Sequence, residues 1–188
     1  SPAATPRFAS ARYEGRTAIV TGAASGIGRA TARRLAAEGA AVGCVDLADA
    51  VDETAELITA DGGTAIAVHV DVSDEASVAD GVADVVDRLG VVTVLANVAG
   101  VLRFGITHQS SVADFDLQLA VNLKGPFLMA RAVIPGMLDH GSGAITDVAS
   151  SAGMFGQAYM PGYVASKGGV VMLSRAMAWE YQKLGIRV

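Results

Sequence analysis

The chain has 188 residues, of which 52% are hydrophobic and 18% charged, a balance typical of one globular domain with a sizeable core. Its 14 Lys and Arg residues and 19 Asp and Glu residues give a net charge of −5, which argues against a nucleic-acid partner because phosphate binding needs a basic surface. The single cysteine, Cys44, excludes an intramolecular disulfide, and no Cys or His cluster has the spacing of metal ligands, so we expect no metal.

The N-terminal segment differs in composition from the rest of the chain. Residues 1–14 are rich in Ala, Ser and Pro and predict a loose arm, so we expect the folded domain to occupy residues 15–188. This opening lacks the hydrophobic core of a signal peptide, and no later apolar run is long enough to span a bilayer. We therefore expect a cytoplasmic protein without membrane contact.

Strand-like and helix-like segments then alternate along the chain. The predicted strands are residues 16–22, 40–46, 64–72, 92–98, 143–150 and 185–188. The predicted helices are residues 27–39, 50–60, 74–89, a long helix within 111–138, and about 163–184. Strands separated by helices imply right-handed crossovers and a parallel sheet covered on both faces. The expected fold is α/β, a Rossmann-like doubly wound sheet in a single domain.

A glycine-rich turn joins the first strand to the first helix. Its glycines are Gly22, Gly26 and Gly28, with the spacing G-x-x-x-G-x-G rather than the strict dinucleotide fingerprint. Glycines let backbone N–H groups approach a pyrophosphate, and the helix that follows offers its positive N-terminal end. The alternative is a turn that only packs a helix closely on a strand.

Asp46 ends the second strand, where a carboxylate can accept hydrogen bonds from the ribose hydroxyls of a dinucleotide and would repel a 2′-phosphate. Neither Ser25 nor Leu47 supplies a cation that could neutralise such a phosphate. These residues favour NAD over NADP. A solvated charge at a strand end is the alternative interpretation of Asp46.

Tyr163 and Lys167 lie four residues apart, so in a helix they are neighbours on one face. Ser150 lies at the end of the predicted fifth strand, where open parallel sheets bind ligands. A nearby ammonium group favours the phenolate form of a tyrosine, as proton transfer at a substrate oxygen requires. Taken singly, each residue also has a structural explanation, because such pairs and turn serines are common.

The glycine turn, Asp46, Ser150 and the Tyr-x-x-x-Lys pattern, in this order, resemble the short-chain dehydrogenase/reductase family over Gly15–Val188. The resemblance implies a catalytic set of Asn122, Ser150, Tyr163 and Lys167. It also implies cofactor contacts from Gly22, Ser25, Gly26, Ile27, Gly28, Asp46, Leu47, Asp71, Val72, Asn97, Ala99, Gly100, Tyr163 and Lys167. Val98 stands where the family has a second Asn after Asn97.

The implied activity is hydride transfer between NAD(H) and a small secondary alcohol or ketone. Tyr163 would act as general acid and base, and Lys167 would favour the phenolate and bind the nicotinamide ribose. Ser150 would hold the substrate oxygen, and Asn122 would position a water. The resemblance also implies a homodimer or homotetramer. Val101, Leu102, Met154 and Phe155 could line an apolar substrate pocket.

Two alternatives stay open. Residues 185–188 begin a buried strand, whereas the resembling family continues into a substrate-covering segment, so the fold is apparently truncated in its sixth strand. We expect the working protein to extend beyond Val188. Without such an extension, a catalytically silent nucleotide-binding protein would be the alternative. A methyltransferase using S-adenosylmethionine would explain the glycine turn but not Ser150, Tyr163 and Lys167.

Overall fold

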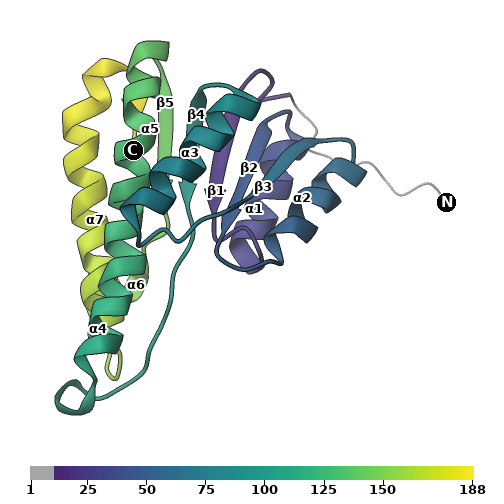
Figure 1. Cartoon of the computed structure of the whole chain (residues 1–188). Coiled ribbons are helices and arrows are strands. Elements are labelled where there is room, and N and C mark those ends of the chain that lie inside the picture. The colour runs from purple at the N-terminus through teal and green to yellow at the C-terminus, as the bar shows by residue number, and fades with distance from the viewer. Residues whose placement is uncertain (1–10) are drawn as a thin grey trace.

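The computed structural model describes residues 11–188 and contains one sheet of six parallel strands in the order β3-β2-β1-β4-β5-β6 (Figure 1). The strands are β1 (Thr17–Thr21), β2 (Ala41–Asp46), β3 (Thr64–His69), β4 (Val92–Asn97), β5 (Gly143–Asp147) and β6 (Ile186–Arg187). This order is that of a doubly wound fold, as the sequence predicts. The chain adds β2 and β3 on one side of β1 and then β4, β5 and β6 on the other, so the strand order reverses between β1 and β4. The reversal leaves a crevice at the carboxyl ends of the strands.

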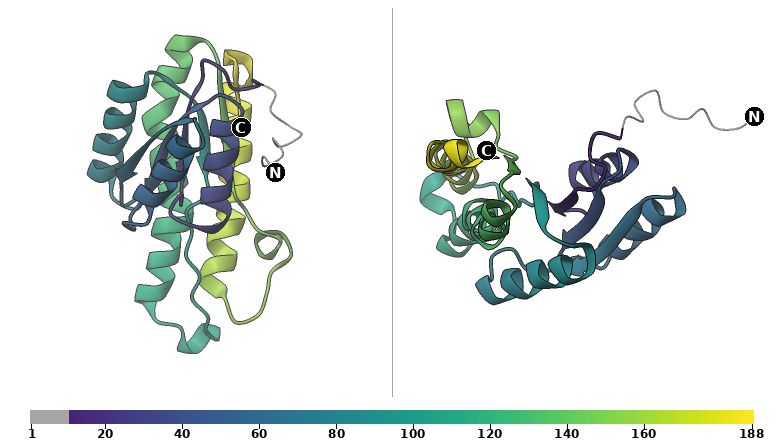
Figure 2. Two further views of the ribbon diagram at one scale, coloured as in Figure 1. Left: turned by 90° about the vertical axis from the view of Figure 1, so that its right-hand side faces the viewer. Right: turned by 90° about the horizontal axis from the view of Figure 1, so that it is seen from above.

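Helices cover the sheet in two layers (Figure 2). One layer consists of α3 (Glu75–Leu89), α5 (Gly125–His140) and α7 (Pro161–Tyr181). The other consists of α1 (Gly26–Ala37) and α2 (Val51–Ala60). Alternate strand residues enter the two cores, so Ile19 packs in the first layer while Ala18 and Val20 pack in the second. On β5, Thr146 is exposed. On the face of the sheet that carries α1 and α2, the part formed by β5 is therefore not covered by these helices.

The predicted long helix within 111–138 is divided in the structure. It consists of α4 (Val112–Leu119), a π-helical turn η2 (Ala120–Lys124) and α5, which continues to His140. The sequence also did not predict the short helix α6 (Ser151–Phe155) or the turn η1 (Thr107–Gln109). The predicted helix of about residues 163–184 consists of α7 followed by the 3₁₀ turn η3 (Gln182–Leu184).

Two strands end three residues earlier than predicted because polar side chains begin a turn. β3 ends at His69 rather than at residue 72, and the Asp71 carboxylate accepts hydrogen bonds from the backbone N–H and hydroxyl of Ser73. β5 ends at Asp147 rather than at residue 150, because Ser150 is the N-cap of α6.

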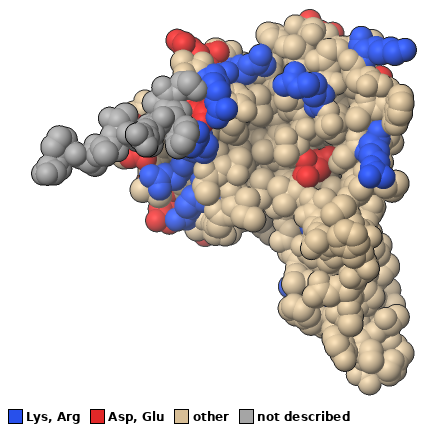
Figure 3. All heavy atoms as spheres, turned by 180° about the vertical axis from the view of Figure 1, so that it is seen from behind, with Lys and Arg blue, Asp and Glu red and all other residues tan. Residues whose placement is uncertain are grey.

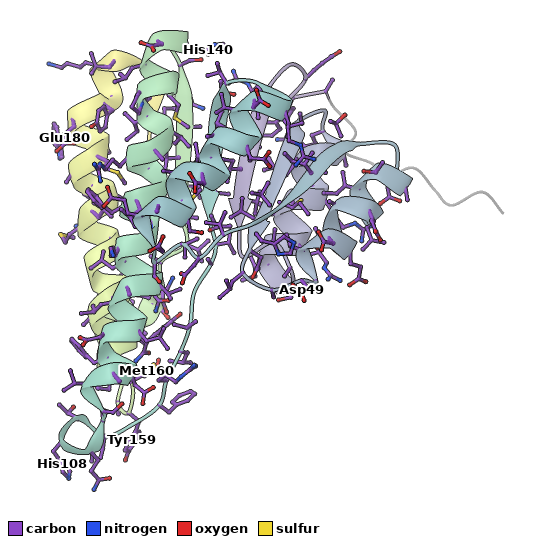
Figure 4. All side chains as sticks on the ribbon, in the orientation of Figure 1. Asp49, His108, His140, Tyr159, Met160 and Glu180 are labelled. Atoms are coloured by element: carbon purple, nitrogen blue, oxygen red, sulfur yellow. The ribbon has the colours of Figure 1, made fainter. Side chains whose placement is uncertain are left out.

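One end of the molecule extends beyond the sheet. We call residues 101–119 and 151–165, which include α4, α6 and the start of α7, the projection (Figure 1). Tyr159 and His108 lie near its tip (Figure 4), where the Gly105 N–H donates to the Tyr159 carbonyl at 2.8 Å. Seen from behind, the projection shows almost no charged side chains (Figure 3). None of the helices within residues 11–188 is long and apolar enough to cross a membrane.

The predicted N-terminal arm falls partly outside the described residues, since only its residues 11–14 are described. Those residues are attached to the domain rather than loose. The Arg12 guanidinium donates to both carboxylate oxygens of Glu38 at 2.5 and 2.6 Å, and the Tyr13 N–H donates to the Glu38 carbonyl. Arg34 binds the same carboxylate, whose side chain is 1% exposed. These contacts hold the pKa of Glu38 down at about 2.

We expect Glu38→Gln to lower the denaturant midpoint of unfolding at pH 7, because it removes the charge that Arg12 and Arg34 bind. The folded-state pKa of Glu38 lies below its ordinary value of 4.5, so the stabilisation is present above pH 4.5 and is lost as the pH falls towards 2. The difference between variant and parent should shrink over that range. Arg33→Gln, in the exposed pair with Asp61, is the control and should change little. An equal effect of Glu38→Gln at pH 3 and pH 7 would contradict the prediction.

Candidate active site

The glycine turn places the first turn of α1 directly on the end of β1. A Cβ atom on Gly28 would lie 1.9 Å from the Gly22 carbonyl oxygen, so no larger residue fits there. Gly26 has a φ of +50°, in the region that favours glycine. Ser25 is the N-cap of α1, but its side chain makes no capping hydrogen bond. The first N–H groups of any helix lack helical partners, and here the N-cap side chain does not bind them, as suits an anion site.

A cleft of 540 Å³ opens at the carboxyl ends of the strands, between the glycine turn and α7. Most of the predicted cofactor-binding residues line it, namely Gly22, Ser25, Gly26, Ile27, Gly28, Asp46, Leu47, Asp71, Val72, Ala99, Gly100, Tyr163 and Lys167. Its other lining residues are Val70, Val98, Val101, Leu102, Val121 and Val148. Of these, Val101 and Leu102 were predicted to line a pocket, and Val98 was noted as a departure from the family pattern. The remaining valines follow strand ends or lie in η2, and hydrophobic periodicity does not distinguish them from core residues.

Asp46 holds the glycine turn as well as lining the cleft. Its Oδ2 accepts a hydrogen bond from the Ala24 N–H at 2.9 Å, and its Oδ1 accepts one from the Ala48 N–H at 3.0 Å. Each carboxylate oxygen has a second lone pair, so Asp46 can still accept from a ligand hydroxyl. Beside it, Ile27 and Leu47 are 66% and 68% exposed. Among the described residues that line the cleft, Lys167 is the one Lys or Arg.

Thr21, which the sequence did not single out, fixes the opposite wall. Its hydroxyl accepts hydrogen bonds from the N–H groups of Val98 and Ala99 at 3.0 and 3.1 Å. The segment that leaves β4 is therefore attached to the end of β1. A threonine at the end of a buried strand has no sequence feature that would reveal this role.

Tyr163 and Lys167 share one face of α7, as predicted. The Lys167 ammonium lies 5.9 Å from the centre of the Tyr163 ring and donates to the Val148 carbonyl oxygen at 2.5 Å. Lys167 is only 4% exposed, and this burial lowers the pKa of its ammonium group, although the charge of Asp147 opposes the change. Within residues 11–188, the Tyr163 phenol makes no hydrogen bond, and Tyr163 lines the cleft.

Ser150 lies beside the cleft but is not among its lining residues. Its Oγ caps α6 by accepting from the Ala152 N–H at 3.2 Å. This bond uses an acceptor lone pair and leaves the hydroxyl hydrogen available for another partner. α6 is held tightly against α7, since a Cβ on Gly153 would lie 2.5 Å from the Lys167 carbonyl carbon. Ser150 is thus fixed relative to Lys167 through the backbone.

Asn122 is fully buried in the π-helical turn η2 and does not line the cleft. Its Oδ1 accepts from the Val101 N–H at 2.7 Å, and its Nδ2 donates to the Val101 carbonyl at 2.9 Å and to Ser166 Oγ at 3.0 Å. The side chain therefore joins the segment after β4 to α7. Its two N–H hydrogens are both committed, and the expected role in positioning a water stays a prediction.

Asn97 is also buried below the cleft rather than lining it. Its Nδ2 donates to Asp147 Oδ1 at 2.8 Å, whereas its Oδ1 is buried without a partner among the described residues. Asp147 Oδ2 also accepts from Ser174 Oγ at 2.6 Å. Nothing in the sequence distinguishes Asp147, because the position falls inside a predicted strand.

Comparison with known proteins identifies the family of this chain. The sequence profile of the short chain dehydrogenase family matches residues 16–188, and the chain belongs to that family. It is 43% identical over 179 residues to YxbG, an uncharacterized oxidoreductase of Bacillus subtilis, covering 94% of this chain and 65% of YxbG. It is 41% identical to the D-threitol dehydrogenase of Mycolicibacterium smegmatis, covering 94% of this chain and 68% of that enzyme.

A solved structure gives the same result for the fold. It is a proposed NAD(P)-dependent gluconate 5-dehydrogenase from Beutenbergia cavernae, with NADP bound at low occupancy. The two chains are 39% identical and superpose with a TM-score of 0.87, over 92% of this chain and 69% of the other. The chain thus spans about two thirds of the length of these relatives.

We expect Asn122→Ala to lower the free energy of unfolding by about 2–4 kcal/mol, because it leaves buried partners on Val101 and Ser166 without their hydrogen bonds. Ser166→Ala removes only one of these bonds and should cost about 1 kcal/mol. Urea unfolding followed by circular dichroism measures both. If the two variants were equally stable, Asn122 would not join the two segments as described.

Proposed function

We propose that this protein is an NAD-dependent oxidoreductase that transfers a hydride between the cofactor and a secondary alcohol or ketone. The observation that carries the proposal is the position of Tyr163 and Lys167 on the same cleft as the uncapped N-terminus of α1. A proton-transfer group and an anion site therefore share one ligand volume. Membership of the short-chain dehydrogenase family and the 41% identical D-threitol dehydrogenase support this assignment.

The residues present fit a nicotinamide dinucleotide. The unpaired N–H groups of the α1 first turn suit the pyrophosphate, and Asp46 suits the hydroxyls of a ribose. Asp71 lines the same cleft, where it would contact the adenine. When bound, the cofactor supplies the group that accepts or donates the hydride. The protein supplies the binding, the orientation and the proton.

Tyr163 moves that proton in the proposed reaction. In the oxidation direction its phenolate takes the proton from the substrate hydroxyl, and in the reduction direction its phenol returns it to the carbonyl oxygen. The Lys167 ammonium stabilises the phenolate through its positive charge. Ser150 donates its free hydroxyl hydrogen to the same substrate oxygen and stabilises the negative charge that develops there.

The lining of the cleft supports a proposal for the substrate class. Val101 and Leu102 belong to the cleft, whereas Met154 and Phe155 are 61% and 83% exposed on the neighbouring projection. This apolar surface favours a hydrophobic secondary alcohol or ketone, and we propose that class.

A homodimer or homotetramer belongs to the same proposal. Phe127 on α5 and Met172 and Trp179 on α7 are large apolar side chains that are exposed in a single chain. The two helices lie side by side in one layer (Figures 1 and 2), so an association of copies through this layer would cover all three residues.

We expect Tyr163→Phe to reduce the turnover of alcohols by about 10²–10⁴-fold, because it removes the transferable proton but keeps the ring. The dissociation constant for NAD, measured by calorimetry, should change little. Tyr159→Phe is the matched control, because Tyr159 is exposed near the tip of the projection and does not line the cleft. NAD binding without turnover in the parent protein would instead favour a silent nucleotide-binding protein. Most of the activity surviving in Tyr163→Phe would remove Tyr163 from the mechanism.

NAD should be preferred over NADP by about tenfold or more in kcat/KM, because Asp46 would repel a 2′-phosphate. The double variant Asp46→Asn with Leu47→Arg should shift the preference towards NADP, since it removes that repulsion and adds a cation. Asn at position 46 keeps an acceptor oxygen for the Ala24 N–H, which protects the glycine turn. Leu47→Gln is the uncharged control. A parent protein that prefers NADP, the cofactor bound in the Beutenbergia structure, would show that Asp46 has another role.

A further inference from the structure

Asp147, the last residue of β5, is held rigidly from both sides. Asn97, its partner in the register of β4 and β5, donates to Oδ1 at 2.8 Å. Ser174, on α7, donates to Oδ2 at 2.6 Å. Both carboxylate oxygens are therefore fixed by neutral donors, and no cation forms an ion pair with Asp147 among residues 11–188. The position of the Asp147 carboxylate at the end of β5 is therefore set by these two hydrogen bonds.

The Asn97 amide has one favourable orientation beside Asp147. Its Nδ2 faces Asp147, and its Oδ1 is left buried without a partner in the described part of the chain. Turning the amide over would place its carbonyl oxygen against the carboxylate, which is repulsive. The amide of Asn97 is thus oriented with its Nδ2 towards Asp147.

The neighbour of this carboxylate is Lys167. Its ammonium donates to the carbonyl of Val148, the residue directly after Asp147, and is almost fully buried. In the described chain, Lys167 has no carboxylate within ion-pairing distance. Burial alone would favour a neutral amine, and a neutral amine could not stabilise a Tyr163 phenolate.

The other groups around Lys167 carry no charge that could replace Asp147. The segments after β4 and in η2 bring the backbone of Gly100 and the neutral amide of Asn122. α6 has no titratable side chain, and Tyr163 is the titratable neighbour on α7 itself. Among the carboxylates on the packed elements, Asp147 is the one whose charge raises the pKa of Lys167 against the effect of burial.

We propose that Asp147 is a positioning residue, whose carboxylate, fixed by Asn97 and Ser174, keeps the buried Lys167 ammonium charged beside Tyr163. The use of that charge in catalysis rests on the proposed function. The electrostatic effect itself is a property of the folded chain and can be measured without turnover.

The chain offers a direct measurement because it contains three lysines, Lys124, Lys167 and Lys183. Lysine labelled with ¹³C at Cε gives one NMR signal per lysine, and the variants Lys124→Arg and Lys183→Arg assign the signals without touching Lys167. A pH titration of the protein without cofactor then gives the midpoint of each lysine. In Asp147→Asn the Lys167 midpoint should fall by about one pH unit, while Lys124 and Lys183 stay unchanged.

Two further variants separate charge from structure. Ser174→Ala removes a hydrogen bond to Asp147 but keeps the carboxylate, so the Lys167 midpoint should stay within about 0.3 units of the parent. Asp147→Ser removes the same charge with a smaller side chain, and its Lys167 midpoint should fall by the same amount as in Asp147→Asn. If Asp147→Asn folds poorly, Asp147→Ser alone tests the effect of the charge. An unchanged midpoint in both Asp147 variants, or an equal shift in Ser174→Ala, would overturn the proposal.

Kinetics then test the link to catalysis. In Asp147→Asn the alkaline limit of kcat for alcohol oxidation should move to lower pH by the same amount as the Lys167 midpoint, with KM for the alcohol unchanged. A shifted midpoint without a shifted kcat profile would overturn the catalytic part of the proposal. If the parent protein shows no turnover, the proposed function fails, and the NMR titration still decides whether Asp147 sets the charge of Lys167.

Discussion

The burial of the Lys167 ammonium is the constraint on which the arrangement of the site depends. A charged group that loses its water must find polar partners in fixed positions. Here the first partner is the carbonyl of Val148, at the point where β5 ends and its backbone leaves the sheet. The contact requires α7 to cross the end of β5 closely. Gly153 permits this approach, since α6, which follows β5, lies almost in backbone contact with α7.

The loops around the cleft are held by side chains that bind backbone groups. Asp46 holds the glycine turn through Ala24, Thr21 holds the segment after β4, and Asn122 holds Val101 from the other side. Each of these bonds fixes a loop that parallel strand geometry alone would leave free. The cleft is therefore formed before a ligand arrives, which reduces the ordering cost of binding.

The fold was largely predictable because its signals are local and repeat along the chain. Buried strands, amphipathic helices and a glycine turn imply a doubly wound sheet, and the observed strand order confirms it. The π-helical turn at Asn122 was not predictable, since its residues fit a continuous helix and the partners of the Asn122 side chain, Val101 and Ser166, are distant in the sequence. The attachment of residues 11–14 through Arg12 and Glu38 depends on a pair 26 residues apart, and composition alone does not reveal it.

The candidate site divides into two groups that a sequence pattern does not separate. Tyr163, Lys167, Asp46 and the glycine turn line the cleft, whereas Asn97 and Asn122 lie beneath it with their amides committed to Asp147 and Val101. A pattern of residues records that a position matters but not whether it touches a ligand or holds a residue that does. Asp147 illustrates the converse, because it belongs to no recognisable sequence pattern and yet its charge raises the pKa of the buried Lys167 ammonium against the effect of burial. The chemistry of such a site therefore depends on side chains of both groups. The second group is identified by its buried hydrogen bonds, such as those of Asn97 and Asn122, and not by a sequence pattern.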